Sequence, residues 1–199
     1  MFSDLNRFAR KTSKSLDVLY DHRDQLSVLT MEVSEEVAVF RGMVDKERLT
    51  LSVRSPKLCT LSMLYDANKE LFDGAIEGNR LRNYDNALQT ATNYWTRMAE
   101  VIPDWGMVKN GQLQATQLRQ EKISCHSVVM RALGGLGRVL MAKHPNDWSN
   151  RLNALKEVDW RKAKGSGVNP QWENVCIVAG SVVSNRQARA ARERAKARR

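Results

Sequence analysis

The sequence predicts a mainly α-helical domain with at most a short β-hairpin. Apolar residues recur at spacings of three and four along several long segments, which is the period of a helix with one buried face. A strict alternation of apolar and polar residues, the pattern of a strand, occurs in one short stretch. The composition, with 42% hydrophobic and 27% charged residues in 199, is that of a globular chain. It excludes a disordered polypeptide, a collagen and a bundle of membrane helices.

The first predicted helices lie in the N-terminal third. A helical turn at residues 3–8 and a short segment over 15–20 precede a helix over 24–37, where Leu26, Leu29 and Val33 share one face. A second helix is expected to begin at Ser55 and Pro56, because serine caps helices and proline suits the first helical position, and to run to residue 72. Between these helices, Leu49, Leu51 and Val53 alternate with polar residues and predict a strand, in a hairpin with residues near Met43.

The remaining helices are predicted over residues 79–102, 123–143 and 148–158. Gly74 and Gly78 mark a break before them, and Pro103 ends the first of them. Gly134, Gly135 and Gly137 are unfavourable inside a helix, so they indicate a kink or a close contact between helices. Residues 104–112 are expected to form a loop or tight hairpin and residues 161–167 a flexible basic loop, while residues 175–183 fit helix and strand equally.

Positive charge is concentrated at the C-terminus. The net charge is +10, and residues 186–199 carry seven basic side chains and one acidic one. Two interpretations of this tail stay open: a solvated basic arm, or an arm that contacts nucleic acid. Nucleic acid is the first partner to test, and an anionic membrane surface the second. The candidate DNA-binding residues of the tail are Arg186, Arg189, Arg192, Arg194, Lys196, Arg198 and Arg199.

The sequence predicts a cytoplasmic protein without a metal or cofactor. No stretch is long and apolar enough to span a membrane, and no signal peptide is recognisable at the N-terminus. Three widely spaced cysteines fit neither a disulfide framework nor a zinc site, so we expect small, reduced, mostly buried thiols. The five tryptophans are expected mainly to anchor short helices against the core, although some lie beside basic residues, as in sites that stack nucleic-acid bases.

No catalytic arrangement stands out. The histidines lie far apart, and the adjacent Cys125 and His126 would point in different directions on a helix. Asp21, His22, Arg23 and Asp24 form a polar cluster that acid–base chemistry could use. Helix caps and ion pairs at a domain boundary are the preferred interpretation of the same residues. Because residues 1–24 offer little to bury, we expect them to be the remnant of an upstream domain, before a helical domain at 25–185 and the tail at 186–199.

Several segments together resemble the DNA sulfur modification family DndB, within the wider DGQHR-domain family. The resemblance rests on MFSDLNRFARKTSKSLDVLYDHRD, TLSVRSPKLCTLSMLYDANKELF, RALGGLGRVL, NPQWENV and GSVVSNR. It implies a ParB-like α/β domain with an Asp-Gly-Gln-His-Arg segment, followed by a helical region. This chain lacks that pentapeptide, so it looks like the C-terminal part of a larger relative. The motif matches, with no role assigned to any, are Phe2, Asp4, Asn6, Asp21, Arg23 and Asp24.

The resemblance also implies a function. Similar proteins accompany the bacterial machinery that places phosphorothioate sulfur in the DNA backbone, where they act as DNA-binding regulators and not in the sulfur chemistry. We therefore expect a non-enzymatic regulatory or accessory protein, with double-stranded DNA as partner, in the cytoplasm with the nucleoid. Two alternatives stay open: a helical module that docks on other DNA sulfur modification proteins, and a fragment of an enzyme whose active site a missing domain completes.

Overall fold

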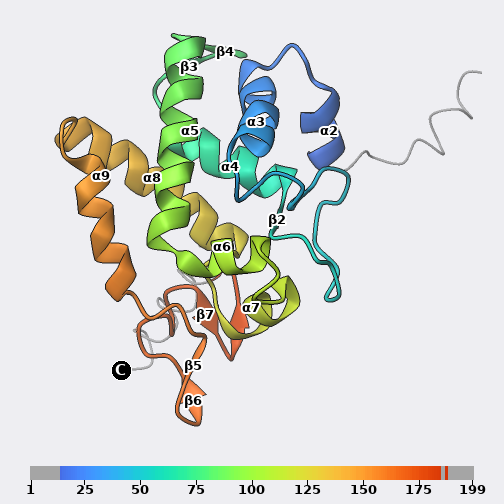
Figure 1. Cartoon of the computed structure of the whole chain (residues 1–199), viewed down its shortest axis with the longest axis vertical. Coiled ribbons are helices and arrows are strands. Elements are labelled where there is room, and N and C mark those ends of the chain that lie inside the picture. The colour runs from blue at the N-terminus through green and yellow to red at the C-terminus, as the bar shows by residue number, and fades with distance from the viewer. Residues whose placement is uncertain (1–13, 185–186, 188–199) are drawn as a thin grey trace, which may run out of the picture.

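A computed structural model describes residues 14–184 and residue 187, and it confirms the mainly α-helical fold (Figure 1). The core lies between four helices: α3 (Gln25–Glu36), α4 (Leu61–Leu71), α5 (Tyr84–Val101) and α8 (Ser127–Lys143). The short α2 (Lys14–Tyr20) packs against α3 and α4. The predicted helices at 24–37, 79–102 and 123–143 are therefore confirmed. The last two begin later than predicted, at Tyr84 and Ser127.

Side-chain caps decide where three of these helices begin. The Asp24 carboxylate accepts a hydrogen bond from the Leu26 N–H at 3.2 Å, at the start of α3. Thr60 caps α4 and Asn83 caps α5 in the same way, by accepting the N–H three residues ahead. Each cap supplies a partner to an amide that the helix leaves unpaired.

A buried polar network joins α3, α4 and α5. The Asn68 amide donates to Thr30 Oγ1 at 3.1 Å and accepts from the Trp95 indole N–H at 2.7 Å. Thr30 in turn donates to the Leu26 carbonyl at 2.7 Å. Because Thr30, Asn68 and Trp95 are fully buried, each bond satisfies a group that water cannot reach.

Two of the three glycines of α8 lie at a close contact between helices. This is one of the two explanations that the sequence analysis offered for glycines inside a helix, the other being a kink. A Cβ at Gly134 would lie 2.0 Å from the Ala67 carbonyl oxygen of α4, and one at Gly137 would lie 2.6 Å from the Tyr94 ring of α5. Gly135, by contrast, faces open space. Glycine at 134 and 137 therefore lets α8 approach its neighbours more closely than any other residue would allow.

The predicted strand at 49–53 and its hairpin are wrong. The structure has instead a parallel pair, β1 (Val44–Asp45) and β2 (Cys59–Thr60), with Val44 opposite Cys59. Residues 46–58 connect the two strands, and we call them the β1–β2 loop. A half-buried strand needs a face to cover, but Leu49 is 54% and Val53 73% exposed.

The predicted helix start at Ser55 and Pro56 is also wrong, although the helix itself exists. The carbonyls of Ser55 and Lys57 accept hydrogen bonds from the Arg119 guanidinium, so they do not point along a helix axis. Thr60 provides the cap that the sequence analysis placed at Ser55. A contact from a distant part of the chain therefore overrides a good local start signal.

Residues 104–112 are mostly helical and not a loop or hairpin. Pro103, expected only as a terminator, is also the first residue of α6 (Pro103–Lys109), and α7 (Ala115–Glu121) follows. The buried residues Trp105 and Val108 are three apart and anchor α6. The Lys122 ammonium, directly after α7, forms an ion pair with the Asp104 carboxylate at 2.8 Å.

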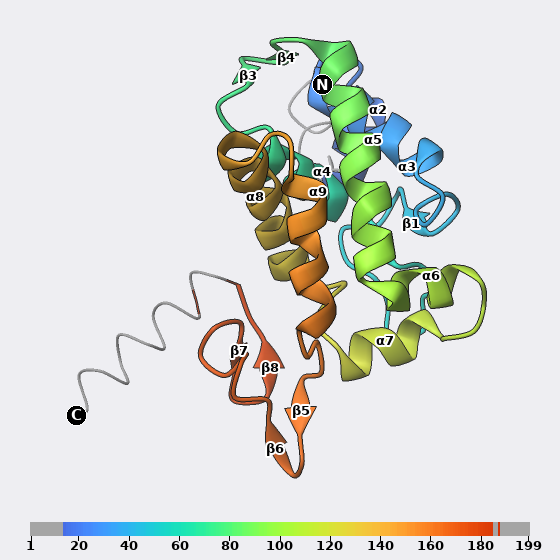
Figure 2. The ribbon, with the colours of Figure 1, turned by 60° about the vertical axis from the view of Figure 1, so that its left-hand side comes forward.

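The C-terminal part combines a helix with two small hairpins (Figure 2). The predicted helix at 148–158 is present as α9 (Trp148–Arg151), continued by the 3₁₀-helix η1 (Leu152–Glu157). Residues 161–167, expected as a flexible loop, contribute to a hairpin of β5 (Ala163–Lys164) and β6 (Gly167–Val168). The undecided segment forms the hairpin β7 (Ile177–Val178) and β8 (Ser181–Val182). A third hairpin lies earlier in the chain, at the break predicted at Gly74 and Gly78. It pairs β3 (Ile76–Glu77) with β4 (Arg80–Leu81).

Tryptophans and cysteines mostly serve the core, as expected. Trp95 and Trp105 are fully buried, and the rings of Trp160 and Trp172, which flank the β5–β6 hairpin in the sequence, stack with their centroids 5.7 Å apart. The thiols of Cys59, Cys125 and Cys176 are buried as well. Of the segment expected to be a domain remnant, residues 14–24 are described, and Ser15 and Val18 are buried there against the helices. The three-part division of the chain remains a prediction.

Candidate functional site

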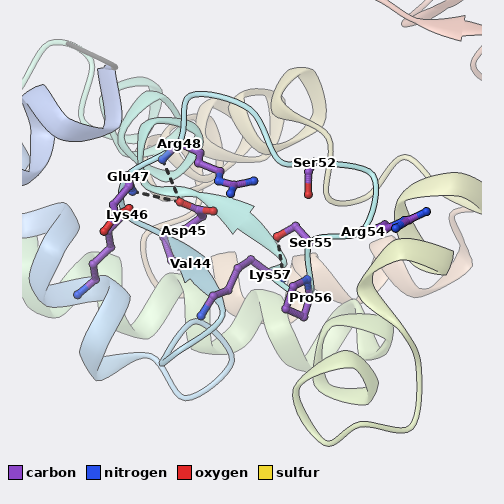
Figure 3. A pocket seen from close by; sticks show the side chains of 10 residues that line it. All are labelled: Val44, Asp45, Lys46, Glu47, Arg48, Ser52, Arg54, Ser55, Pro56 and Lys57. Atoms are coloured by element: carbon purple, nitrogen blue, oxygen red, sulfur yellow. Dashed lines mark hydrogen bonds between the residues drawn. The ribbon is translucent and has the colours of Figure 1, made fainter.

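The candidate site is a pocket of about 540 Å³ formed by β1 and the β1–β2 loop (Figure 3). Ten residues line it, and four of them are basic while two are acidic. The surrounding segment, residues 41–57, carries five basic and two acidic side chains. The basic lining residues are Lys46, Arg48, Arg54 and Lys57.

The first half of the β1–β2 loop is held by the carboxylate of Asp45, the last residue of β1, and by α2. Asp45 Oδ1 accepts hydrogen bonds from the backbone N–H groups of Glu47 at 3.1 Å and Arg48 at 2.9 Å. The Ser15 hydroxyl donates to the Arg48 carbonyl at 2.7 Å. The backbone that carries Arg48 is thus fixed on both sides.

The second half of the loop is held by Arg119, which projects from α7. Its guanidinium donates to the carbonyls of Lys57 at 2.5 Å and Ser55 at 2.6 Å, and it also reaches the Ser52 and Val53 carbonyls at 3.5 Å. Burial lowers the pKa of Arg119, but a guanidinium remains charged at neutral pH. Several charge-assisted bonds from one planar group therefore define the shape of the loop.

The backbone of Arg119 connects this loop to the C-terminal part. Its carbonyl accepts a hydrogen bond from the Lys162 ammonium and lies 3.0 Å from His126 Nε2. Burial lowers the pKa of His126 and of Lys162, and it raises the pKa of the neighbouring Cys125 thiol to about 11. Cys125 is therefore a protonated, unreactive thiol at neutral pH, and this cluster is structural.

Two arginines of the pocket are available to bind an anion. Lys46 pairs with Glu35, and the Lys57 ammonium donates to the Gly42 carbonyl at 2.7 Å. Arg48 and Arg54 are exposed, and neither guanidinium forms an ion pair within residues 14–184. The Arg54 side chain extends away from the other lining residues (Figure 3). A fixed backbone with two exposed guanidinium groups that form no ion pair among the described residues is suited to phosphate contacts.

The polar cluster at 21–24 borders a second pocket of about 460 Å³, next to α4 and the β3–β4 hairpin. Asp24, besides capping α3, accepts hydrogen bonds from the Ser27 hydroxyl at 2.8 Å and the Tyr65 hydroxyl at 2.9 Å. Asp21 accepts the Arg23 N–H at 3.1 Å. Burial, followed by the bond to Asp24, raises the pKa of Tyr65. Asp24 thus makes a helix cap, as the preferred interpretation expected, while Asp21 stabilises a turn. The ion pairs of that interpretation are not formed by Asp21, Arg23 or Asp24 among the described residues.

The other predicted site residues lie outside the described part of the chain. They are Phe2, Asp4 and Asn6 among the motif matches, and the tail residues Arg186, Arg189, Arg192, Arg194, Lys196, Arg198 and Arg199. Of the predicted residues that the structure describes, Asp21 and Asp24 line one pocket, and Asp21 and Arg23 line another.

Sequence analysis missed the β1–β2 loop as a candidate site. Its signal was present, because Arg48 and Arg54 flank the alternating stretch that was interpreted as a strand. Arg119 had no local signal, since its partners lie more than 60 residues earlier in the chain.

Within the described residues, no group of three or more histidine, cysteine, aspartate or glutamate side chains is placed to hold a metal ion. No helix in the same part of the chain has the length and hydropathy needed to cross a membrane.

Fold and site together define a mainly helical protein with a rigidly held, basic surface loop. A family model matches residues 1–197, and its description is DndB, DNA-sulfur modification-associated. The chain belongs to this family, and it is thereby associated with DNA sulfur modification. No curated protein and no solved structure matches the chain.

Proposed function

We propose that this protein is a DNA-binding regulatory or accessory protein of a bacterial DNA phosphorothioation system, and that it regulates transcription of the modification genes. In this proposal the β1–β2 loop contacts the phosphate backbone of double-stranded DNA, together with the basic tail at 186–199. The protein would work in the cytoplasm, at the nucleoid DNA.

The observation that carries the proposal is the pair Arg48 and Arg54. Both guanidinium groups are exposed on a loop whose backbone is fixed by Asp45, Ser15 and Arg119. Most hydrogen bonds between proteins and DNA go to phosphate and sugar oxygens, and arginine is a frequent donor. Because the loop is already ordered, binding does not have to offset the entropy of ordering it.

The test is a titration of DNA binding against salt for Arg48→Ala/Arg54→Ala. Each phosphate contact contributes about 0.9 to the slope of log K against log salt, so losing two contacts should flatten the slope by about 2. Fluorescence anisotropy with a promoter duplex of the modification genes and with a scrambled duplex gives both the slope and the sequence preference.

The matched control is Arg80→Ala/Lys143→Ala. These exposed cations lie on β4 and at the end of α8, away from the loop, and removing them changes the net charge equally. We expect the control to retain the wild-type slope. Equal flattening by both double variants would mean that net charge, and not the loop, determines binding. Tighter binding to the promoter than to the scrambled duplex is expected of a regulator.

A second candidate function is docking on other DNA sulfur modification proteins. One observation favours it: residues 14–36 carry six acidic and two basic side chains, and Tyr20 is 71% exposed there. A segment with this excess of negative charge suits a basic protein partner and repels DNA. Charge reversal at Asp17 and Asp21 should abolish such docking and leave DNA binding unchanged, which separates the two functions.

A further inference from the structure

Two of the most exposed apolar side chains lie on the β1–β2 loop. Val53 is 73% and Leu49 54% exposed, although large aliphatic side chains are normally buried. Arg48 directly precedes Leu49, and Arg54 directly follows Val53. The loop therefore presents two exposed apolar side chains, each with an arginine as its neighbour in the sequence.

We call residues 48–54, which include these apolar side chains, the tip of the loop. Hydrogen bonds fix the backbone at both ends of this tip. Hydrogen bonds hold the Arg48 carbonyl at one side of the tip and the Ser55 carbonyl at the other. The loop projects beside the helical body, away from α8 and α9 (Figure 1). Leu49 and Val53 thus protrude from a preorganised support, and inserting them into a partner requires little ordering.

We propose that the β1–β2 loop enters the minor groove of duplex DNA and distorts it, with Leu49 and Val53 pressed between base steps. Arg48 and Arg54 then lie on phosphates at the two sides of the inserted pair. This inference rests on the proposed DNA-binding function and adds the mode of contact. Insertion of apolar side chains from the minor groove partly unstacks base steps and kinks the duplex toward the major groove. Cations beside the inserted side chains can contact the phosphates that flank the kink.

The charge distribution favours DNA over a protein as the occupant. The acidic residues of the segment, Asp45 and Glu47, lie on one side of the tip, and Asp45 is already occupied by backbone N–H groups. The tip itself, residues 48–54, has two cations and no carboxylate. Exposed apolar side chains with arginines as sequence neighbours match base steps flanked by phosphates.

The test measures DNA distortion by the full-length protein. A duplex labelled at both ends reports bending by energy transfer, and 2-aminopurine at single positions reports unstacking. The variant Leu49→Ser/Val53→Ser keeps every charge, and because both side chains are exposed the fold should persist, as thermal melting will verify. We expect this variant at saturation to lose the bending and unstacking signals, to bind on the order of tenfold more weakly, and to keep the salt slope.

The matched control is Val139→Ser/Val175→Ser, two valines that are 43% and 44% exposed elsewhere on the surface. It should distort DNA as the wild-type protein does. Full distortion by Leu49→Ser/Val53→Ser would overturn the inference, as would wild-type binding without any distortion. In either case a salt slope that still depends on Arg48 and Arg54 leaves the proposed function intact. Absence of wild-type binding would instead reject the proposed function itself.

Discussion

At the scale of single residues, Arg119 connects three parts of the molecule. Its side chain holds the β1–β2 loop, and its carbonyl receives Lys162 from the C-terminal part and approaches His126 at the start of α8. Lys162 and the Arg119 guanidinium already carry positive charge in this partly buried cluster. Protonation of His126 would therefore add a third positive charge and is unfavourable there. Histidine is the residue type in this cluster whose ordinary pKa lies nearest to neutral pH, and burial lowers the pKa of His126 in the folded protein.

We therefore predict that His126 makes stability depend on pH. Burial first, and then the charge of Lys162, lowers the pKa of His126 in the folded protein. In the unfolded chain a histidine has a pKa of about 6.5. Below this pH the unfolded state therefore takes up a proton that the folded state does not. The free energy of unfolding should fall as pH decreases from about 6.5, until the lowered folded pKa is reached.

Urea denaturation of the wild-type protein and of His126→Gln at several pH values between about 5 and 8 measures this effect. Relative to their values at pH 8, the free energy of unfolding should fall less at low pH for His126→Gln than for the wild-type protein. His22→Gln, at an exposed position, serves as the control and should follow the wild-type curve. Parallel curves for wild type and His126→Gln would contradict the prediction.

At the scale of elements, the contact between α4 and α8 makes a sharp prediction. A methyl group at Gly134 would collide with the Ala67 backbone, whereas one at Gly135 would meet nothing within 4 Å. Gly134→Ala should destabilise the protein by about 3 kcal/mol, since the backbone of α4 has to move. Gly135→Ala should stabilise it by up to about 1 kcal/mol through helix propensity alone.

Chemical denaturation gives both values, and the two variants control one another because they make the same substitution one position apart. Equal changes in the free energy of unfolding would mean that helix propensity alone determines the effect and that the close approach of α8 to α4 is wrong. Opposite signs would support the packing.

The same elements show why part of the fold was predictable from sequence. The long helices have a buried stripe at helical period, which the sequence carries locally. The glycines of α8 predicted either a kink or a close helix contact, and Gly134 and Gly137 make the close contact. The segments at 49–57 and 104–112 were misassigned because distant groups determine them. Arg119 orders the first, and the ion pair between Lys122 and Asp104 helps to fix the second. For the same reason composition revealed the basic tail, but not the loop that Arg119 shapes.

At the scale of the whole molecule, charge is distributed unevenly along the chain. Residues 14–36 carry six acidic and two basic side chains, while residues 41–57 carry five basic and two acidic ones. The tail at 186–199 adds seven basic residues and one acidic one. If the protein binds DNA as proposed, such a distribution would orient it with the two basic segments, the loop and the tail, toward the polyanion.

The final prediction separates the contributions of these two regions. Deleting residues 186–199 removes seven cations, and if four or five of them reach phosphates, the slope of log K against log salt should flatten by roughly 4. The affinity loss should be similar for promoter and random duplexes, because phosphate contacts carry no sequence information. Any preference for the promoter should persist, since the helical domain remains, and the Arg48→Ala/Arg54→Ala change should flatten the slope of the shortened protein further. Anisotropy titrations from low to moderate salt measure all four combinations. An unchanged slope after the deletion would assign the DNA contacts to the helical domain alone.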